Sequence, residues 1–294
     1  MTRGVDDGGT LYVVATPIGN LADVSLRSID VLRAVPLVAA EDTRLTRRLW
    51  ARHDITTRLV SYHARSPDTR EGELIAHLEG GDDLALVTDA GTPLVSDPGE
   101  GLVAAWAARD GRVIAIPGPS AVLAALTTSG LRVPRWGFEG FLPRRGSERR
   151  ARIERIATDD RATVLFEAPG RLAATLRELA AACGDARRGS VARELTKRFE
   201  ETWRGTLAEL ADRASAGAVR GEITIVVEGA TEGWGGPAGG TGAGSEGTPA
   251  SDLEAAAARV DALVASGVAR SAAARKVAAE TGHPRRVLFA HPRK

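Results

Sequence analysis

The sequence contains one cysteine, Cys183, among its 294 residues. A single thiol excludes a disulfide within the chain and a structural zinc site built from several cysteines. The five histidines are scattered without the spacing of metal ligands, so we expect no metal site. These absences favour a reducing, cytoplasmic setting.

Long hydrophobic runs and lysines are also scarce. No segment approaches the roughly 18 apolar residues of a membrane-spanning helix, and residues 1–10 lack the apolar core of a signal peptide. The only lysines are Lys197, Lys276 and Lys294, which suggests a genomic bias toward arginine and draws attention to Lys197 in mid-chain. The net charge of +1 carries no signal for nucleic acid by itself.

Apolar runs of strand length alternate with helical patterns through most of the chain. We therefore predict an α/β protein with the following parts: a disordered tail (1–10), a parallel α/β domain (11–130), a second α/β domain whose sheet is either parallel or mixed (135–229), a flexible Gly-rich linker (230–250) and a small helical module (251–294).

The stretch 84–99, LALVTDAGTPLVSDPG, is the centre of the first predicted domain. Its apolar start predicts a buried strand, and the polar loop that follows is much longer than the usual two to six residues, roughly, of such connections. Either the loop only caps the next helix, or it lines a ligand pocket. Its length and small residues favour a pocket.

Four loops follow predicted parallel strands, at 16–20, 41–44, 89–98 and 117–121. The carboxyl ends of parallel strands lie at one edge of a sheet, so we expect these loops to converge on a site. The sequence has no G-x-G-x-x-G, no P-loop and no G-x-S-x-G motif there. Dinucleotide oxidoreductases, P-loop NTPases and α/β-hydrolases are therefore disfavoured.

Charged residues near these strand ends have two readings each. Glu41 and Asp42 either begin a helix or take part in chemistry, and Glu194 and Lys197 either form an ion pair in a turn or act in a site. Clustered arginines either form a solvated helix face or contact RNA phosphates, and we favour RNA. The candidate RNA-binding residues are Arg44, Arg47, Arg48, Arg144, Arg145, Arg149 and Arg150.

Several long blocks are distinctive: LYVVATPIGNLADVSLRSIDVLRAVPLVAAEDTR, LVTDAGTPLVSDPG, IPGPSAVLAALTTSGL, FEGFLPR, VARELTK and RGEITIVVEG. They resemble the ribosomal RNA small subunit methyltransferase I family, which belongs to the tetrapyrrole-methylase-like, class III S-adenosylmethionine (SAM) methyltransferases. The resemblance covers about residues 11–229. The chain departs from the family pattern at Leu45, Phe166, Ala168 and Gly170, where the family commonly has His, Tyr, Ser and His.

The resemblance implies two α/β domains with SAM in the cleft between them, a homodimer, and methylation of the ribose 2′-hydroxyl of a cytidine in the decoding region of 16S rRNA. The cofactor-binding residues that it implies are Pro17, Asp89, Gly91, Thr92, Val95, Ser120, Ala121, Phe166, Leu195 and Glu222. Candidates for assisting the hydroxyl are Glu41, Asp42, Glu194 and Lys197. Lys197 needs a depressed pKa to act as a base, whereas as a cation it polarises the hydroxyl.

Two alternatives remain open at this point. One is a methyltransferase that acts on a tetrapyrrole of the precorrin or uroporphyrinogen type, and the other is a non-catalytic RNA-binding factor for ribosome assembly. The arginine clusters and the terminal module, with Arg270, Arg275, Lys276, Arg285 and Arg286, disfavour the first. The complete cofactor loop disfavours the second.

Overall fold

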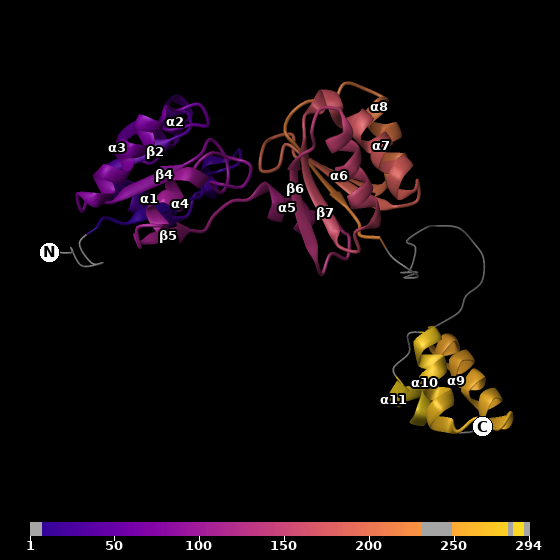
Figure 1. The fold of residues 1–294 in the computed structure, drawn as a ribbon. Coiled ribbons are helices and arrows are strands. Elements are labelled where there is room, and N and C mark those ends of the chain that lie inside the picture. The colour runs from indigo at the N-terminus through magenta and orange to yellow at the C-terminus, as the bar shows by residue number, and fades with distance from the viewer. Residues whose placement is uncertain (1–7, 231–248, 282–284, 291–294) are drawn as a thin grey trace. The chain divides into compact units, whose positions relative to one another are not determined.

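The computed structural model describes residues 8–230, 249–281 and 285–290. The chain divides into two units, Met1–Glu232 and Gly233–Lys294, and each is described by itself (Figure 1). The first unit contains two five-stranded sheets, which we call the N-terminal and the second domain. Among the described residues, no helix is long and apolar enough to cross a membrane.

The N-terminal domain has a wholly parallel sheet in the order β3-β2-β4-β1-β5. Its strands are β1 (Leu11–Val14), β2 (Leu37–Ala40), β3 (Arg58–Ser61), β4 (Leu84–Val87) and β5 (Val113–Ile116). The helices are α1 (Leu26–Ala34), α2 (Thr43–Arg52), α3 (Asp68–Glu79), α4 (Glu100–Ala107) and α5 (Ala121–Thr128), with a 3₁₀ turn, η1 (Leu21–Asp23). Strands β2 and β4 are buried along their whole length, which explains their uninterrupted apolar sequences.

Polar residues cap several of the helices in this domain. The side chains of Ser25, Asp42 and Ser120 accept hydrogen bonds from the first-turn amides of α1, α2 and α5. Such caps satisfy amides that have no partner within the helix. The loops at 41–44 and 117–121 are therefore held in place by the helices that they start.

The second domain has a mixed sheet, as the sequence predicts. Its strands β6 (Trp136–Phe141), β7 (Ala162–Glu167), β8 (Arg188–Arg193), β9 (Glu201–Thr206) and β10 (Ile223–Val227) lie in the order β6-β7-β10-β8-β9. Only the β6–β7 pair is parallel. The helices are α6 (Ser147–Thr158), α7 (Leu172–Cys183) and α8 (Leu207–Ser215), with a 3₁₀ turn, η2 (Pro169–Arg171).

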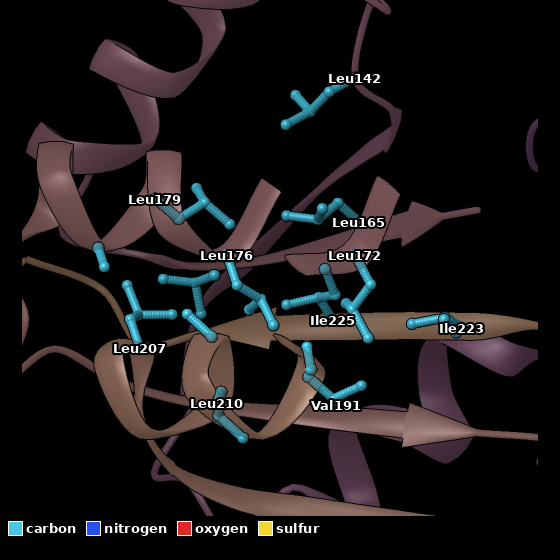
Figure 2. Packing of buried hydrophobic residues seen from close by; sticks show 14 of the residues in the cluster. Leu142, Leu165, Leu172, Leu176, Leu179, Val191, Leu207, Leu210, Ile223 and Ile225 are labelled. Atoms are coloured by element: carbon cyan, nitrogen blue, oxygen red, sulfur yellow. The ribbon is translucent and has the colours of Figure 1, made fainter. Parts of the chain in front are cut away.

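The two faces of this second sheet have different coverings. On one face, leucines of α7 and α8, including Leu176 and Leu207, pack on Val191 and Ile225 (Figure 2). On the other, α5 of the N-terminal domain packs against Val164, Ala192 and Val226. Arg204 adds a hydrogen bond to the carbonyl of Thr128 at the end of α5, with Nη2 2.6 Å from the oxygen. Helix α5 therefore joins the two domains.

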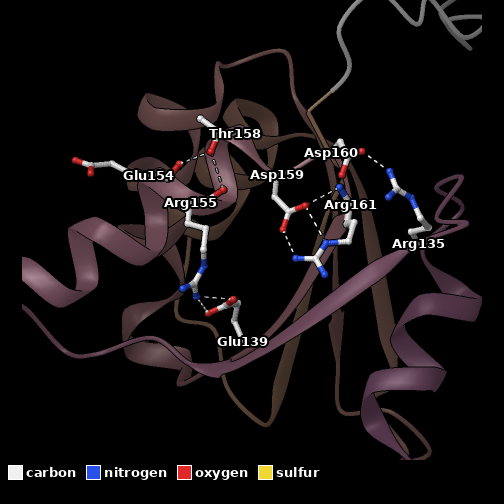
Figure 3. Close-up of polar contacts among 8 residues, drawn as sticks. All are labelled: Arg135, Glu139, Glu154, Arg155, Thr158, Asp159, Asp160 and Arg161. Carbon is white, nitrogen blue, oxygen red and sulfur yellow. Dashed lines mark hydrogen bonds and ion pairs between the residues drawn. The ribbon is translucent and has the colours of Figure 1, made fainter.

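Several ion pairs lie at the end of the second domain that carries the α6–β7 turn (Figure 3). Arg155 of α6 reaches Glu139 of β6 at 2.7 Å, and Arg161 pairs with Asp159 at 2.8 Å. Arg135 and Asp160 form a further pair. The hydrogen bonds from Arg161 hold the pKa of Asp159 at about 2, well below its usual value. Arg155 is thus used in a contact between α6 and β6.

The second unit is a small helical module. Helices α9 (Pro249–Ala265), α10 (Arg270–Thr281) and α11 (Arg285–Ala290) enclose a core of small apolar side chains with Leu288. The prediction of a helical module at residues 251–294 agrees with these helices, but α9 begins at Pro249, two residues before the predicted start of the module.

The predicted tail (1–10) and the predicted linker (230–250) each include residues at one end that the structure shows to be ordered. Thr10 is buried and its amide donates to Asp83 Oδ1 at 2.6 Å, while the Gly9 amide donates to the Leu78 carbonyl. At the linker, the Ala230 amide donates to the Asp159 carbonyl. The remaining predicted tail and linker residues, 1–7 and 231–248, lie outside the described residues.

Candidate active site

A pocket lies between the N-terminal and second domains of the first unit. It holds about 790 Å³ of space, including its open mouth. Its walls come from the loops after β1, β4 and β5, and from β6, β7, the turn after β8, and the start of β10. Three of the four loops that the sequence predicts to converge thus form one wall.

Most of the predicted cofactor residues line this pocket. They are Gly91, Thr92, Val95, Ser120, Ala121, Phe166, Leu195 and Glu222. Pro17 and Asp89 do not line it, but each precedes a residue that does, Ile18 and Ala90. Pro17 is buried, and Asp89 instead binds the backbone at the end of β2.

The sequence analysis missed the remaining pocket residues, Ile18, Ala90, Ser96, Asp97, Val122, Phe141, Ile223 and Thr224. Several of them are neighbours of predicted residues in the same loops. The sequence therefore identified the loops correctly, but not which side chains of each loop line the pocket. Phe141 had a signal in the FEGFLPR block, where it ends β6. It packs against Phe166 with ring centroids 5.6 Å apart.

Hydrogen bonds hold the three converging loops together. The amides of Thr16 and Gly91 each donate to the other's carbonyl, at 2.8 and 3.0 Å, and the Thr92 hydroxyl donates to the Pro119 carbonyl at 3.2 Å. In the central loop, Leu94 and Ser96 have φ values of 70° and 72°. Left-handed conformations of residues other than glycine store strain and concentrate at functional sites.

Carboxylates gather beside the pocket on the N-terminal domain. The Asp42 amide donates to Asp89 Oδ1 at 2.9 Å, and the Asp89 amide donates to Glu41 Oε2 at 3.3 Å. Burial raises the pKa of Asp97 to about 6, and the negative charges of Glu41 and Asp89 contribute. Burial likewise raises the pKa values of Glu41 and Asp89.

Asp42 differs from these three carboxylates. Its side chain caps α2 and binds Arg44, with Nη2 2.6 Å from Oδ2. These hydrogen bonds hold the pKa of Asp42 at about 2. The helix-start reading of Asp42 is therefore confirmed. Among the described residues, no three His, Cys, Asp or Glu side chains are placed to hold a metal ion.

On the second domain, an ammonium lies between two carboxylates, of which only Glu222 lines the pocket. Lys197 Nζ is 2.9 Å from Glu194 Oε1 and 3.0 Å from Glu222 Oε2, and Glu194 Oε1 also accepts from the Glu222 amide. Burial alone lowers the pKa of Lys197, but the hydrogen bonds that its ammonium donates to both carboxylates outweigh burial and raise the pKa. Lys197 is therefore a cation. A role for Lys197 as a base, which requires a depressed pKa, is not supported.

Close contacts fix this ion group. Glu194 and Thr196 have φ values of 52° and 67°. A Cβ on Gly19 would lie 2.5 Å from Lys197 Cγ, so the first loop presses directly on the lysine stem. The Asn20 amide donates to Thr196 Oγ1 at 3.2 Å across the two domains. The site is built from contacts that both domains must supply.

Comparison with known proteins identifies the family. The Tetrapyrrole (Corrin/Porphyrin) Methylases model matches residues 10–211. The chain is 43% identical to the Ribosomal RNA small subunit methyltransferase I of Synechocystis sp. over 281 residues, 96% of each protein. The chain belongs to this methyltransferase family. It is also 48% identical to the family's protein from Mesorhizobium japonicum, over 74% of each protein.

A solved relative of the methyltransferase family shows the same fold. The uroporphyrin-III C-methyltransferase of Thermus thermophilus, complexed with S-adenosylhomocysteine, has a TM-score of 0.54 and 18% identity, covering 75% of this chain and 97% of that one. The predicted family and two-domain α/β fold are confirmed.

The predicted RNA-binding arginines of this methyltransferase divide into exposed and buried members. Arg149 is only 6% exposed, and its guanidinium binds Glu178 Oε2 at 2.8 Å, Thr175 Oγ1 at 2.9 Å and the Pro143 carbonyl at 3.0 Å. The structure thus contradicts a phosphate-binding role for Arg149, because its donors are used inside the second domain. The exposed members are Arg44, Arg47, Arg48, Arg144, Arg145 and Arg150.

Proposed function

We propose that this protein transfers a methyl group from SAM to the ribose 2′-hydroxyl of a cytidine in the decoding region of small-subunit 16S rRNA, in the cytoplasm and as a homodimer. The observation that carries the proposal is the pocket between the domains, with a cationic Lys197 group on one side and raised-pKa carboxylates on the other. The names of the relatives support the rRNA acceptor.

The pocket fits SAM chemically. Phe141, Phe166 and Leu195 offer apolar surface for an adenosine, and Thr92 and Ser120 offer hydroxyls at its rim. The carboxylates of Asp97 and Glu222 complement a sulfonium charge. S-adenosylhomocysteine, bound by the Thermus thermophilus relative, is SAM without its transferred methyl.

When bound, SAM supplies an activated methyl group, and the chain's own residues must align and deprotonate the acceptor. Alignment of a nucleophile with its target is itself a large part of the rate enhancement. Lys197, as a cation, stabilises negative charge that develops on the ribose oxygen. Asp97 is the proton acceptor that we propose, because it lines the pocket and has a pKa of about 6.

The other predicted catalytic residues take supporting roles in this proposal. Glu194 positions Lys197 through the 2.9 Å ion pair, and Glu41 raises the pKa of Asp97 by its charge. Asp42 holds Asp89 and the start of α2 in place. All three therefore act on the site through other groups.

Exposed arginines are the surfaces that we propose for rRNA. Arg144, Arg145 and Arg150 border one hollow near the start of α6, and Arg44, Arg47 and Arg48 lie on α2 beside the carboxyl edge of the first sheet. On the terminal module, Arg275 and Lys276 are exposed on α10, and Arg270 of the same helix pairs with Asp261. The predicted Arg285 and Arg286 side chains lie outside the described residues.

The test is methyl transfer from labelled SAM to purified small ribosomal subunits that lack the modification, followed by mapping of the labelled nucleotide. Label on one cytidine ribose is the expected result. Label on a base contradicts the proposed acceptor atom. SAM binding without transfer to subunits or free rRNA contradicts the rRNA acceptor and favours a tetrapyrrole, whereas no SAM binding favours an assembly factor.

A further inference from the structure

A second hollow lies on the helix-covered face of the second domain, away from the proposed SAM pocket. It holds about 600 Å³, including open space, between the β8–β9 edge, α8 and the turn before β10. We call it the arginine hollow and define it by Arg193, Glu201, Trp203, Arg213, Val219 and Arg220. None of these residues belongs to the surfaces discussed above.

Strand alternation connects the arginine hollow to the active site. Along β8, Val191 faces the α7–α8 core and Ala192 faces α5, so Arg193 returns to the α8 face, where it pairs in register with Glu201. The next residue, Glu194, binds Lys197 at the active site. The same sheet edge therefore carries the arginine hollow on one side and the lysine group on the other.

A second link runs through the turn before β10. Arg220 borders the hollow, and Glu222, two residues later, lines the proposed SAM pocket and binds Lys197. The Arg220 carbonyl accepts from Arg193 Nη1 at 3.3 Å. Two residues of extended chain span at most about 7 Å, so a ligand at Arg220 lies close to the wall of the active site.

The charge of the arginine hollow is unbalanced. Glu201 accepts from Arg193 Nη2 at 3.1 Å and also from Arg213, so one carboxylate faces two guanidinium groups. Arg220 is exposed, and its guanidinium has no partner among the described residues. Interactions with Trp203 and both arginines keep the pKa of Glu201 low, so its charge persists and the hollow has a net positive charge of about two.

The arrangement of side chains in the arginine hollow favours binding of a phosphate over binding of a nucleobase. Arg213 stacks over Trp203, with 4.5 Å between its guanidinium carbon and the ring centroid. Because Trp203 is only 6% exposed, its ring is covered and offers no platform for a nucleobase. Guanidinium groups match phosphate oxygens in geometry and charge.

We infer that the arginine hollow binds a backbone phosphodiester of the rRNA next to the target nucleotide, with Arg220 as the contacting cation. Arg193 and Arg213, which Glu201 holds in place, supply the remaining positive field. A phosphate held here positions the chain of the RNA relative to Lys197 and the pocket. This inference rests on the proposed rRNA substrate and adds a docking point to it.

The test measures binding of the full-length protein to 16S rRNA across a series of salt concentrations. For Arg220→Ala we expect about tenfold weaker binding at fixed salt and a slope of log affinity against log salt that is shallower by about one. SAM affinity stays unchanged, because the Arg220 guanidinium has no hydrogen-bond or ion-pair partner among the described residues and does not line the proposed SAM pocket. Arg220→Lys retains the charge and should recover most of the salt slope.

Arg188→Ala is the matched control, because Arg188 is an exposed arginine at the opposite end of β8 from Arg193. It should bind rRNA like the wild type. Equal affinities and salt slopes for Arg220→Ala and Arg188→Ala overturn the inference. Wild-type protein that binds rRNA but transfers no methyl contradicts the proposed function while the Arg220 effect stands, so the two failures are distinguishable.

Discussion

The two walls of the active site differ in how the charges of their carboxylates are compensated. On the N-terminal domain, burial raises the pKa of Glu41, Asp89 and Asp97, and the negative charge of neighbouring carboxylates adds to the effect in each case. On the second domain, Glu194 and Glu222 share the ammonium of Lys197. The first arrangement leaves a carboxylate able to take up a proton near neutral pH, and the second fixes a charge that does not titrate there.

We propose that this contrast reflects what each domain contributes to methyl transfer. A raised pKa suits a group that must accept a proton, and a compensated cation suits a group that stabilises charge in place. In this proposal the two roles belong to different domains, with the proposed SAM pocket between them. The predictions below disturb one wall at a time.

The largest effect is expected from Lys197→Met, which keeps most of the stem and removes the charge. Glu194 and Glu222 then face each other without a cation, and the developing charge on the acceptor loses its stabilisation. We expect the turnover rate to fall by about 10²- to 10³-fold. Labelled-methyl transfer at saturating SAM measures the rate, and SAM titration serves as the control for an intact pocket. Turnover close to the wild type removes Lys197 from the chemistry.

Asp97→Asn is expected to lower turnover by about 10²-fold, because the amide cannot accept the proton. Activity of the wild type should fall as the pH drops through about 6, where Asp97 becomes protonated. The variant should lose this acid limb and retain SAM binding. An acid limb that persists unchanged in Asp97→Asn assigns the titration to another group.

For Asp97→Asn we expect the stability at neutral pH to rise, although the turnover rate falls. A carboxyl group with a raised pKa in the folded state binds protons more readily there than when unfolded, so its contribution to stability decreases as the pH rises from about 4 toward 6. At pH 7 Asp97 is ionised in an unfavourable environment. Asp97→Asn should therefore raise the Tm at pH 7 and change it less at pH 4, and a lower Tm at pH 7 contradicts this account.

Gly221→Ala is expected to weaken the second wall through the backbone. Gly221 has a φ of 90°, and an added Cβ would lie 2.4 Å from Glu194 Cγ. Alanine strains this conformation and displaces the carboxylate that holds Lys197, so we expect a loss of about 1–2 kcal/mol in the free energy of unfolding and a reduced turnover rate. Gly217→Ala is the matched control, since its Cβ would meet nothing within 4 Å.

The sequence predicted the strands and loops of the N-terminal domain well, because alternating βα units keep each strand apolar and each loop at the same edge. Strand β4 (Leu84–Val87) coincides with the apolar start of the stretch 84–99. The sequence could not show which of Arg144, Arg145, Arg149 and Arg150 is buried, because Arg149 is set apart by contacts to Glu178 and Thr175, which α7 brings from about 26–29 residues away.

The pocket was predicted less completely than the fold. Asp97 belongs to the long loop 89–98 of the sequence, but its raised pKa depends on burial and on the charges of Glu41 and Asp89, which folding brings near it. Likewise, the sequence allowed an ion pair between Glu194 and Lys197, which the structure contains, but no local pattern reveals that Glu222 shares the lysine. Local sequence identifies a loop, whereas the electrostatics of its side chains depend on contacts made in the folded chain.

The smallest effect is expected from Asp42→Asn, which tests whether the first wall depends on every carboxylate. Asn is as good a helix cap as Asp, so α2 should still begin at Thr43. The Arg44 ion pair is exposed on the arginine side and contributes little. We expect turnover and SAM affinity close to the wild type, measured as above, with a small loss of Tm.

The Tm of the wild type should also depend on the charge of Asp42 at low pH. The hydrogen bonds that hold the pKa of Asp42 at about 2 are lost on protonation, so the stabilisation by Asp42 should disappear as the pH falls from about 4 to 2. The Asp42→Asn variant should lack this contribution to the pH dependence of the Tm. A large loss of turnover at neutral pH would place Asp42 with Asp97 in the chemistry, and the contrast between the two walls would then include a second catalytic carboxylate.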